Sequence, residues 1–370
     1  MGQRADGMTT EFGTDVVEAL GRALKVAVRI ELTAVGTDTV LEALVGETDA
    51  GEAITPGMRA AGSLGGHIRA LAGSGRWVSE DDAEAVEDRE VDAVWREVRW
   101  RYHLAKREPA ELPGTTGALR ACLHHALESA RAEGALAVRH RHVARALLEI
   151  PGTRAREAMT LERVDTTAAL DRLAALEPDE APESSGIHVL RMGGAFGRRR
   201  NPVMRVLGSL VSGSGVNGSP VMGAVNAEAQ RQAARHGRGT ARPADQLLGV
   251  LALDRALSVA GLALPDDLKA ANSGAAVLRR HGVRQDTLTA ALGTTGEDEA
   301  ATTTEDATIA LTPAAQRVTD VARLCAAEHG APTTGTVHLL AALLDDETIV
   351  GLLGLDVAAL RADLTPLLGA

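Results

Sequence analysis

The sequence predicts an all-α protein built from repeated helical units, and three observations favour this fold class. Hydrophobic residues make up 45% of the 370 residues but aromatic residues only 2%, so the core must consist mainly of Ala, Leu and Val. This composition favours closely packed helices over sheets, in which aromatic and β-branched residues are preferred. Apolar residues recur at helical spacing, and similar helix starts and stops occur several times along the chain.

The last unit shows this pattern most clearly. Thr312 and Pro313 predict a helix start, because threonine is a favoured N-cap and proline fits the first helical position. Gly330 predicts the end of this helix, whose expected apolar stripe is Val318, Val321, Ala322, Cys325 and Ala326. Gly335 precedes a second helix with an apolar face of Leu339, Leu340, Leu343 and Leu344. A short third helix is expected to end at Gly354, and a fourth carries Leu360, Leu364, Leu367 and Leu368.

Three further units repeat parts of this pattern. In the third unit, Ser219–Pro220 predicts a helix start, and the paired leucines follow after one inserted residue. In the second unit, Gly134 and His142 have the same spacing as Gly330 and His338. In the first unit, residues 36–41 (Gly-Thr-Asp-Thr-Val-Leu) parallel residues 335–340 (Gly-Thr-Val-His-Leu-Leu). Each unit is too short to bury its own apolar faces, so the units are expected to pack together.

Two segments have the composition of linkers. One begins at Glu177 and is rich in acidic residues and proline, and the other, near residue 300, consists mainly of Thr, Glu, Asp and Ala. We therefore expect a first double repeat over 10–176, a linker and two further units. The expected boundaries are 10–113 (first unit), 114–176 (second), 177–217 (linker), 218–292 (third), 293–308 (linker) and 309–370 (fourth).

The repeated unit resembles the repeat of the N-terminal domain of Clp-type unfoldase chaperones. The likeness lies in a first helix, a second helix opened by Gly-Thr-x-His-Leu-Leu at residues 335–340, a short third helix, and Gly-Leu-Asp at 354–356 before the last helix. The resemblance implies an all-α fold of tandem four-helix repeats that form two pseudo-twofold double-repeat domains. In Clp unfoldases, this domain precedes ATPase modules and captures substrates, adaptors, phosphoarginine-marked proteins and certain cyclic peptide antibiotics.

The phosphate loop of those ATPase modules is absent from this sequence. The loop requires a Gly-Lys pair, and the three lysines, Lys25, Lys106 and Lys269, follow Leu, Ala and Leu. The resemblance therefore implies a non-catalytic protein- or peptide-binding module that needs no cofactor. Its expected partners are Clp unfoldase or protease components, their substrates or peptide ligands. It would act as an adaptor, decoy or regulator, and sequestering peptides or Clp-targeting antibiotics is one such role.

In that family, an acidic residue after Gly-Thr helps to bind an arginine-type ligand, because a carboxylate pairs with a guanidinium group. The first unit keeps Thr37 and Asp38 at these positions. Arg141 and Val337 replace the acid in the second and fourth units, and Asp245 or a neighbour takes its place in the third. The candidate ligand residues are Thr37, Asp38, Thr336 and His338. Thr and Asp at a helix start are also ordinary caps.

Two other motifs suggest alternative functions. Gly213–Gly218 matches G-x-G-x-x-G, which holds a pyrophosphate when it joins a strand to a helix, so a nucleotide-binding enzyme is one alternative. Arg198, Arg199 and Arg200 form a basic patch suited to an acidic partner, or to DNA in a scaffold or DNA-associated regulator. The net charge of −11 argues against a general nucleic-acid binder.

Aromatic and acidic residues gather between Trp77 and Tyr102. Trp95 and Tyr102 fall on one helix face, which either belongs to the core or forms an exposed contact surface for a partner. The acidic run from Glu80 to Glu90 is expected to be a solvated helix face.

The histidines and cysteines predict neither a metal site nor a disulfide. His140 and His142 stand two apart at a helix start and so point in different directions, and the remaining clustered histidines are His124 and His125. Cys122 and Cys325 are far apart in the sequence and show no disulfide framework, so we expect both to be reduced, as cysteines are in cytosolic proteins. No apolar run is long enough for a membrane span, and the N-terminus has no signal pattern. We therefore expect a cytoplasmic protein.

Overall fold

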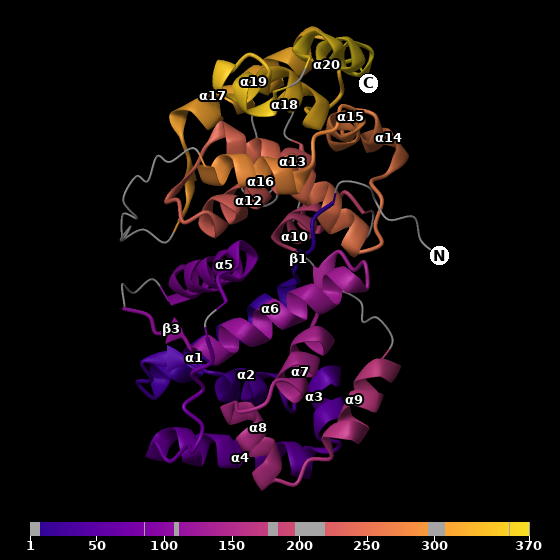
Figure 1. Ribbon diagram of the computed structural model, residues 1–370. Helices are drawn as coiled ribbons and strands as arrows, with labels where there is room; N and C mark the ends of the chain where they lie inside the picture. Colours follow the sequence, from indigo (N-terminus) through magenta and orange to yellow (C-terminus); the bar gives the residue numbers. More distant parts are fainter. Residues whose placement is uncertain are drawn as a thin grey trace. The chain divides into compact units, whose positions relative to one another are not determined.

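The computed structural model describes residues 8–84, 86–106, 111–176, 184–196, 219–294, 308–354 and 356–369. In these ranges it contains 19 α-helices, and 68% of the residues are helical. The predicted, mainly helical fold class is therefore confirmed. The chain divides into two compact units, an N-terminal unit of Thr10–Pro182 and a C-terminal unit built mainly on Glu183–Ala370 (Figure 1).

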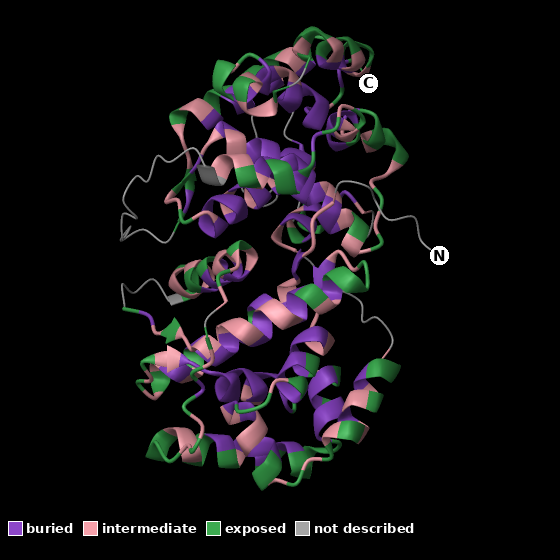
Figure 2. Ribbon diagram, viewed as in Figure 1, coloured by how far each residue is buried: buried purple, intermediate pink, exposed green. Residues whose placement is uncertain are grey.

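The helices of the N-terminal unit surround one apolar core (Figure 2). Its largest fully buried side chains come mainly from α1, α2, α4 and α6, as Leu or Ile side chains about one helical turn apart. Along the chain the helices are α1 (Thr14–Arg29), α2 (Thr37–Leu44), α3 (Asp49–Ile54), α4 (Met58–Ser74), α5 (Arg89–Lys106), α6 (Gly117–Ala132), α7 (His140–Glu149), α8 (Arg154–Leu161) and α9 (Thr166–Ala175).

Helix α6 illustrates how local sequence sets these boundaries. The hydroxyl of Thr116 caps its start by accepting a hydrogen bond from the backbone N–H of Leu119, at 3.1 Å. Leu119, Leu123 and Leu127 then face the core at four-residue spacing. The chain turns away at Gly134, whose φ of +70° is a left-handed conformation that glycine adopts at little cost.

The C-terminal unit has its own core, which shares no residue with that of the N-terminal unit. The predicted starts at Pro220 and Pro313 and the predicted end at Gly354, where φ is +59°, are confirmed. Its helices are α10 (Ser185–Met192), α12 (Pro220–Arg235), α13 (Pro243–Val259), α14 (Asp266–Lys269), α15 (Gly274–Arg280), α16 (Gln285–Thr294), α17 (Pro313–Glu328), α18 (Thr336–Leu343), α19 (Glu347–Leu353) and α20 (Val357–Leu364), followed by the 3₁₀ turn Thr365–Leu367.

Helix α10 lies within residues 177–217, which we expected to form a linker throughout. Ser184 caps its start, and Ile187 and Leu190 are completely buried against the core of the C-terminal unit. The linker prediction was wrong here because two buried apolar residues, Ile187 and Leu190, are too few to give a recognisable helical periodicity in the sequence. Residues 197–218 lie outside the described ranges.

Six strands of two residues each form three parallel pairs within the described ranges. They are β1 (Glu11–Phe12) with β4 (Ala137–Val138), β2 (Ala34–Val35) with β3 (Gly114–Thr115), and β5 (Thr240–Ala241) with β6 (Ala310–Leu311). Each strand lies just before a helix start, so the pairs hold helix starts side by side. Two-residue strands have no detectable alternation, and the sequence did not predict them.

In the region around the tryptophans, the aromatic residues agree with one of the two expectations, but the acidic run differs from its expectation in two respects. Trp95 belongs to the core, and Tyr102 is partly buried against it, so the aromatic face of α5 points inward. The described residues of the acidic run before Arg89, where α5 begins, are not helical. Within this run, Asp81 is buried rather than solvated.

No helix in the described part of the chain is both long enough and apolar enough to cross a membrane.

Candidate functional site

Helices α2, α7, α13 and α18 begin with the same side-chain cap. In each, the third helical residue accepts a hydrogen bond from the backbone N–H of the residue before the helix. The four bonds are Gly36 N to Thr39 Oγ1 (3.1 Å), Arg139 N to His142 Nδ1 (2.8 Å), Arg242 N to Asp245 Oδ2 (2.9 Å) and Gly335 N to His338 Nδ1 (3.0 Å). The repeated motif thus has a structural role at its histidine position.

This geometry corrects the interpretation of Asp245. We matched it with the acidic position that follows Gly-Thr, but its carboxylate occupies the place of His338. Ala244 is the second residue of α13 and therefore stands at the acidic position. The mismatch arose because Gln246 is inserted between Asp245 and the leucine pair Leu247 and Leu248. Aligning the two units on their leucines therefore paired Asp245 with the residue before His338 instead of with His338.

Thr336 and His338 are both buried and both engaged. The Nε2–H of His338 donates to the carbonyl oxygen of Leu368 at 2.9 Å, and burial lowers the pKa of His338. The backbone N–H of Thr336 donates to the side-chain oxygen of Asn272 at 3.0 Å. Its hydroxyl oxygen accepts from the N–H of Gly274, at the start of α15, at 3.1 Å.

Thr37 repeats the role of Thr336 in the N-terminal unit. Its hydroxyl oxygen accepts from the N–H of Ala155, in the first turn of α8, at 3.1 Å. Its own N–H and O–H groups donate to the two carboxylate oxygens of Asp81, at 2.9 and 2.6 Å. Thr37 therefore joins the starts of two helices in the same way as Thr336.

Asp81 brings three helix starts together. Besides both groups of Thr37, its carboxylate accepts from the hydroxyl of Thr116 at 2.8 Å and from the N–H of Arg154 at 3.0 Å. It therefore caps α2 and α8 and contacts the cap of α6, where a carboxylate is also favoured by the helix dipoles. Its φ of +59° is unusual for a residue other than glycine. Sequence analysis missed this role, because Asp81 is one of several acidic residues in an irregular segment.

Asp38 lies beside Asp81 and is only 1% exposed. Its pKa is raised from 3.8 to about 6, by burial first and then by the negative charge of Asp81. The positive charge of Arg154 and the N–H groups of Asp38 and Thr39 oppose this rise, but neither carboxylate oxygen accepts a well-aligned hydrogen bond. Since Thr37 and Asp38 are both buried, neither side chain is open to a ligand in this structure.

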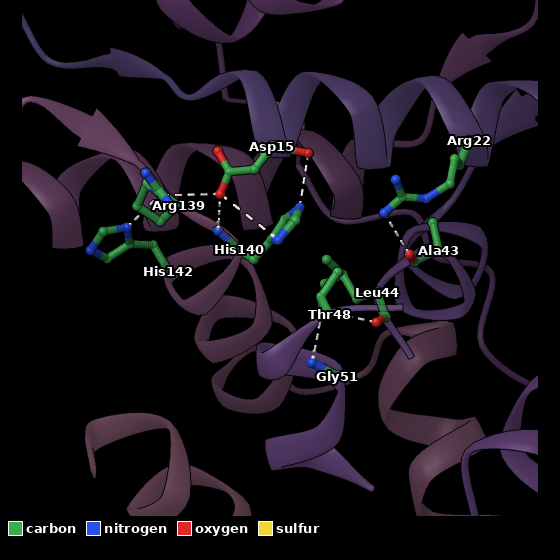
Figure 3. Close-up of polar contacts among 9 residues, drawn as sticks. All are labelled: Asp15, Arg22, Ala43, Leu44, Thr48, Gly51, Arg139, His140 and His142. Carbon is green, nitrogen blue, oxygen red and sulfur yellow. Dashed lines mark hydrogen bonds and ion pairs between the residues drawn. The ribbon is translucent and has the colours of Figure 1, made fainter. Parts of the chain in front are cut away.

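A second buried aspartate, Asp15 in the first turn of α1, lies where the starts of α1 and α7 meet (Figure 3). One oxygen of Asp15 accepts from Arg139 Nε at 3.1 Å and from the N–H of His140 at 3.2 Å. The ring Nε2–H of His140 donates to the carbonyl oxygen of Asp15 at 2.8 Å. His140 and His142 thus serve two different helix junctions. In the described ranges, no cluster of three or more His, Cys, Asp or Glu side chains could hold a metal ion.

A pocket of about 350 Å³ opens between α7, α9 and the end of α6. Its wall combines five charged side chains, one histidine and a small apolar floor. The lining residues are Glu133, Arg141, His142, Arg145, Glu149, Leu170, Asp171, Leu173 and Ala174. The volume is at the lower end of the range of ligand sites in proteins, which suits one side chain or a small fragment.

Most polar groups of this pocket are paired within the wall. One oxygen of Glu133 contacts Arg141 Nη2 at 2.5 Å and His142 Nε2 at 3.2 Å. Glu149 accepts from Arg145 Nε at 2.8 Å and from the His125 ring at 2.7 Å. Burial raises the pKa of Glu149, but these two partners outweigh it and lower the pKa below its usual value.

Arg198, Arg199, Arg200 and the Gly213–Gly218 motif lie outside the described residues. Cys122 is fully buried, and burial raises the pKa of its thiol to about 12, so this thiol is unreactive at neutral pH.

Comparison of the chain with protein-family models, with curated proteins and with solved structures finds no match in any of the three.

Proposed function

We propose that this protein is a non-catalytic protein- and peptide-binding module of the Clp N-terminal type, which acts in the cytoplasm as an adaptor, decoy or regulator of a Clp unfoldase–protease system. In this proposal, the chain contains two tandem double repeats. The units of the first are α1–α5 and α6–α9, and those of the second are α12–α16 and α17–α20.

One hydrogen bond that recurs at three helix starts carries the proposal. The N–H of the N-cap residue of a unit's first helix donates to the carbonyl oxygen just before the second helix of the other unit. The bonds are Gly13 to Val138 (2.9 Å), Thr116 to Val35 (3.0 Å) and Thr312 to Ala241 (2.9 Å). In the N-terminal unit, each proposed repeat both donates and accepts this bond, which is the reciprocity expected of a twofold pair.

The threonine junctions support the same arrangement. Thr37 links α2 of the first proposed repeat to the start of α8 of the second, and Thr336 links α18 of the fourth to the start of α15 of the third. Because these bonds join segments far apart in the chain, a generic bundle of leucine-rich helices would have no reason to repeat them. The connection to Clp then rests on the resemblance of the motif, and the pocket between α7 and α9 offers a place for a peptide side chain.

A pull-down from native cytosol with the purified chain tests this function. We expect enrichment of a Clp unfoldase, a protease subunit or their substrates, and competition by a Clp-targeting cyclic peptide. Heat-denatured chain on the same support controls for nonspecific capture of unfoldase substrates. If no Clp component is enriched and the cyclic peptide does not bind, the likeness is one of architecture only and the proposed function is wrong.

A further inference from the structure

The pocket between α7 and α9 has an excess of negative charge. Three carboxylates, Glu133, Glu149 and Asp171, face two guanidinium groups, Arg141 and Arg145. His142 adds no charge at neutral pH, because burial lowers its pKa and outweighs the effect of Glu133. The wall therefore carries one negative charge that is not balanced within it.

That charge is located on Asp171. Each of the other two carboxylates has two donors, and each guanidinium has a carboxylate partner at 2.8 Å or less. Asp171 lies on the exposed side of α9, and among the described residues it forms no hydrogen bond or ion pair. An anionic ligand would have to break an existing pair, whereas a cation meets a carboxylate that is already free.

We propose that this pocket binds the basic side chain of a peptide, with the ammonium or guanidinium group against Asp171 and the aliphatic stem over Leu170 and Leu173. The stem has an apolar contact because Leu170 and Leu173 both line the pocket, and Leu170 is only partly buried in the core. Lysine and arginine side chains commonly bury such stems while their charge stays near water. The peptide nature of the ligand rests on the proposed function, but the preference for a cation rests on the pocket alone.

Three small probes separate charge from shape. The full chain, ¹³C-labelled at leucine methyl groups, is titrated with the N-acetyl methylamides of lysine, norleucine and glutamate and followed by NMR. We expect the lysine probe to shift the methyl resonances of Leu170 and Leu173 with a Kd on the order of millimolar, which is typical of one side chain. The norleucine probe, which has the same stem without the charge, should bind more weakly, and the glutamate probe should not bind.

Asp171→Asn tests the proposed contact directly. It should weaken binding of the lysine probe roughly threefold to tenfold and leave that of norleucine unchanged, as expected for a partly exposed ion pair. Glu128→Gln, which removes an exposed charge on α6 outside the pocket, is the matched control and should change neither. Equal binding of lysine and norleucine, tighter binding of glutamate, or an unaffected Asp171→Asn variant would each overturn the proposal.

The probe titration tests the ligand class of the pocket, and the pull-down tests the Clp function, so a negative result in one does not decide the other. Binding of the lysine probe without any Clp partner would refute the Clp function and leave the pocket's ligand class in place. Capture of Clp components by a chain that does not bind the lysine probe would refute the ligand class alone.

Discussion

Asp38 is a buried carboxyl group whose ionisation opposes folding. Its folded pKa of about 6 lies above its ordinary value of 3.8. A group with a raised folded pKa contributes stability that is complete below the unfolded pKa and is lost as the pH rises through the folded pKa. The N-terminal unit should therefore lose up to about 3 kcal/mol of stability from this group between pH 4 and pH 7.

We expect Asp38→Asn to stabilise the N-terminal unit at pH 7.5 and to have little effect at pH 4. Urea unfolding followed by tryptophan fluorescence measures this unit alone, because Trp77, Trp95 and Trp100 all belong to it. Asp171→Asn, which changes an exposed carboxylate, is the control and should keep the pH dependence of the parent chain. If the stability of Asp38→Asn depended on pH as strongly as that of the parent chain, the assignment of this titration to Asp38 would be wrong.

His338 combines a helix cap with a tertiary hydrogen bond, and we expect His338→Ala to remove both. The cost should be about 2 kcal/mol, since the cap and the bond to Leu368 each contribute roughly 1 kcal/mol. His338→Asn keeps an acceptor for the cap and should lose about half as much. Hydrogen exchange of peptides from α18 measures the change, with the exposed His329→Ala as control. Unchanged protection in His338→Ala would show that these bonds do not hold the helix start.

At the scale of elements, an irregular segment holds three helices together. Asp81→Ala should destabilise the N-terminal unit by about 2 to 3 kcal/mol, because it leaves the N–H groups of Thr37 and Arg154 and two hydroxyl groups without their acceptor. Relief of the repulsion with Asp38 offsets part of this loss. The urea midpoint from tryptophan fluorescence gives the magnitude, and hydrogen exchange should increase at the starts of α2 and α8.

Asp82→Ala removes the neighbouring carboxylate, which is exposed, and serves as the matched control. It should change neither the midpoint nor the exchange rates. Similar effects of the two substitutions would indicate that the acidic segment acts through its overall charge rather than through the hydrogen bonds of Asp81.

On the scale of the whole molecule, the two cores are built from separate sets of residues. We therefore expect fragments 10–182 and 183–370 to fold on their own, since each contains one complete core. Cooperative urea unfolding of each fragment, followed by far-UV circular dichroism, checks this expectation. A fragment that unfolds without a cooperative transition would show that its core depends on the remainder of the chain.

The sequence by itself determined the helical class and many helix boundaries. Thr312 and Pro313 start α17, and Gly354 ends α19, because caps and left-handed turns depend on a few neighbouring residues. The histidine at the third position of α7 and α18 likewise has a local role, because His142 and His338 cap the starts of these helices. Even here, burial was less predictable, since Val321 belongs to the apolar stripe of α17 but is 42% exposed.

Only the tertiary structure decided how distant segments converge. The two-residue strands, the reciprocal hydrogen bonds and the pocket between α7 and α9 all join residues far apart in the chain. Asp81 has no local pattern that distinguishes it from Asp82, yet one is buried among three helix starts and the other is exposed. Local propensities specify where a helix begins, whereas the partners of a side chain depend on which helices pack together, and a single sequence does not encode that in any short-range pattern.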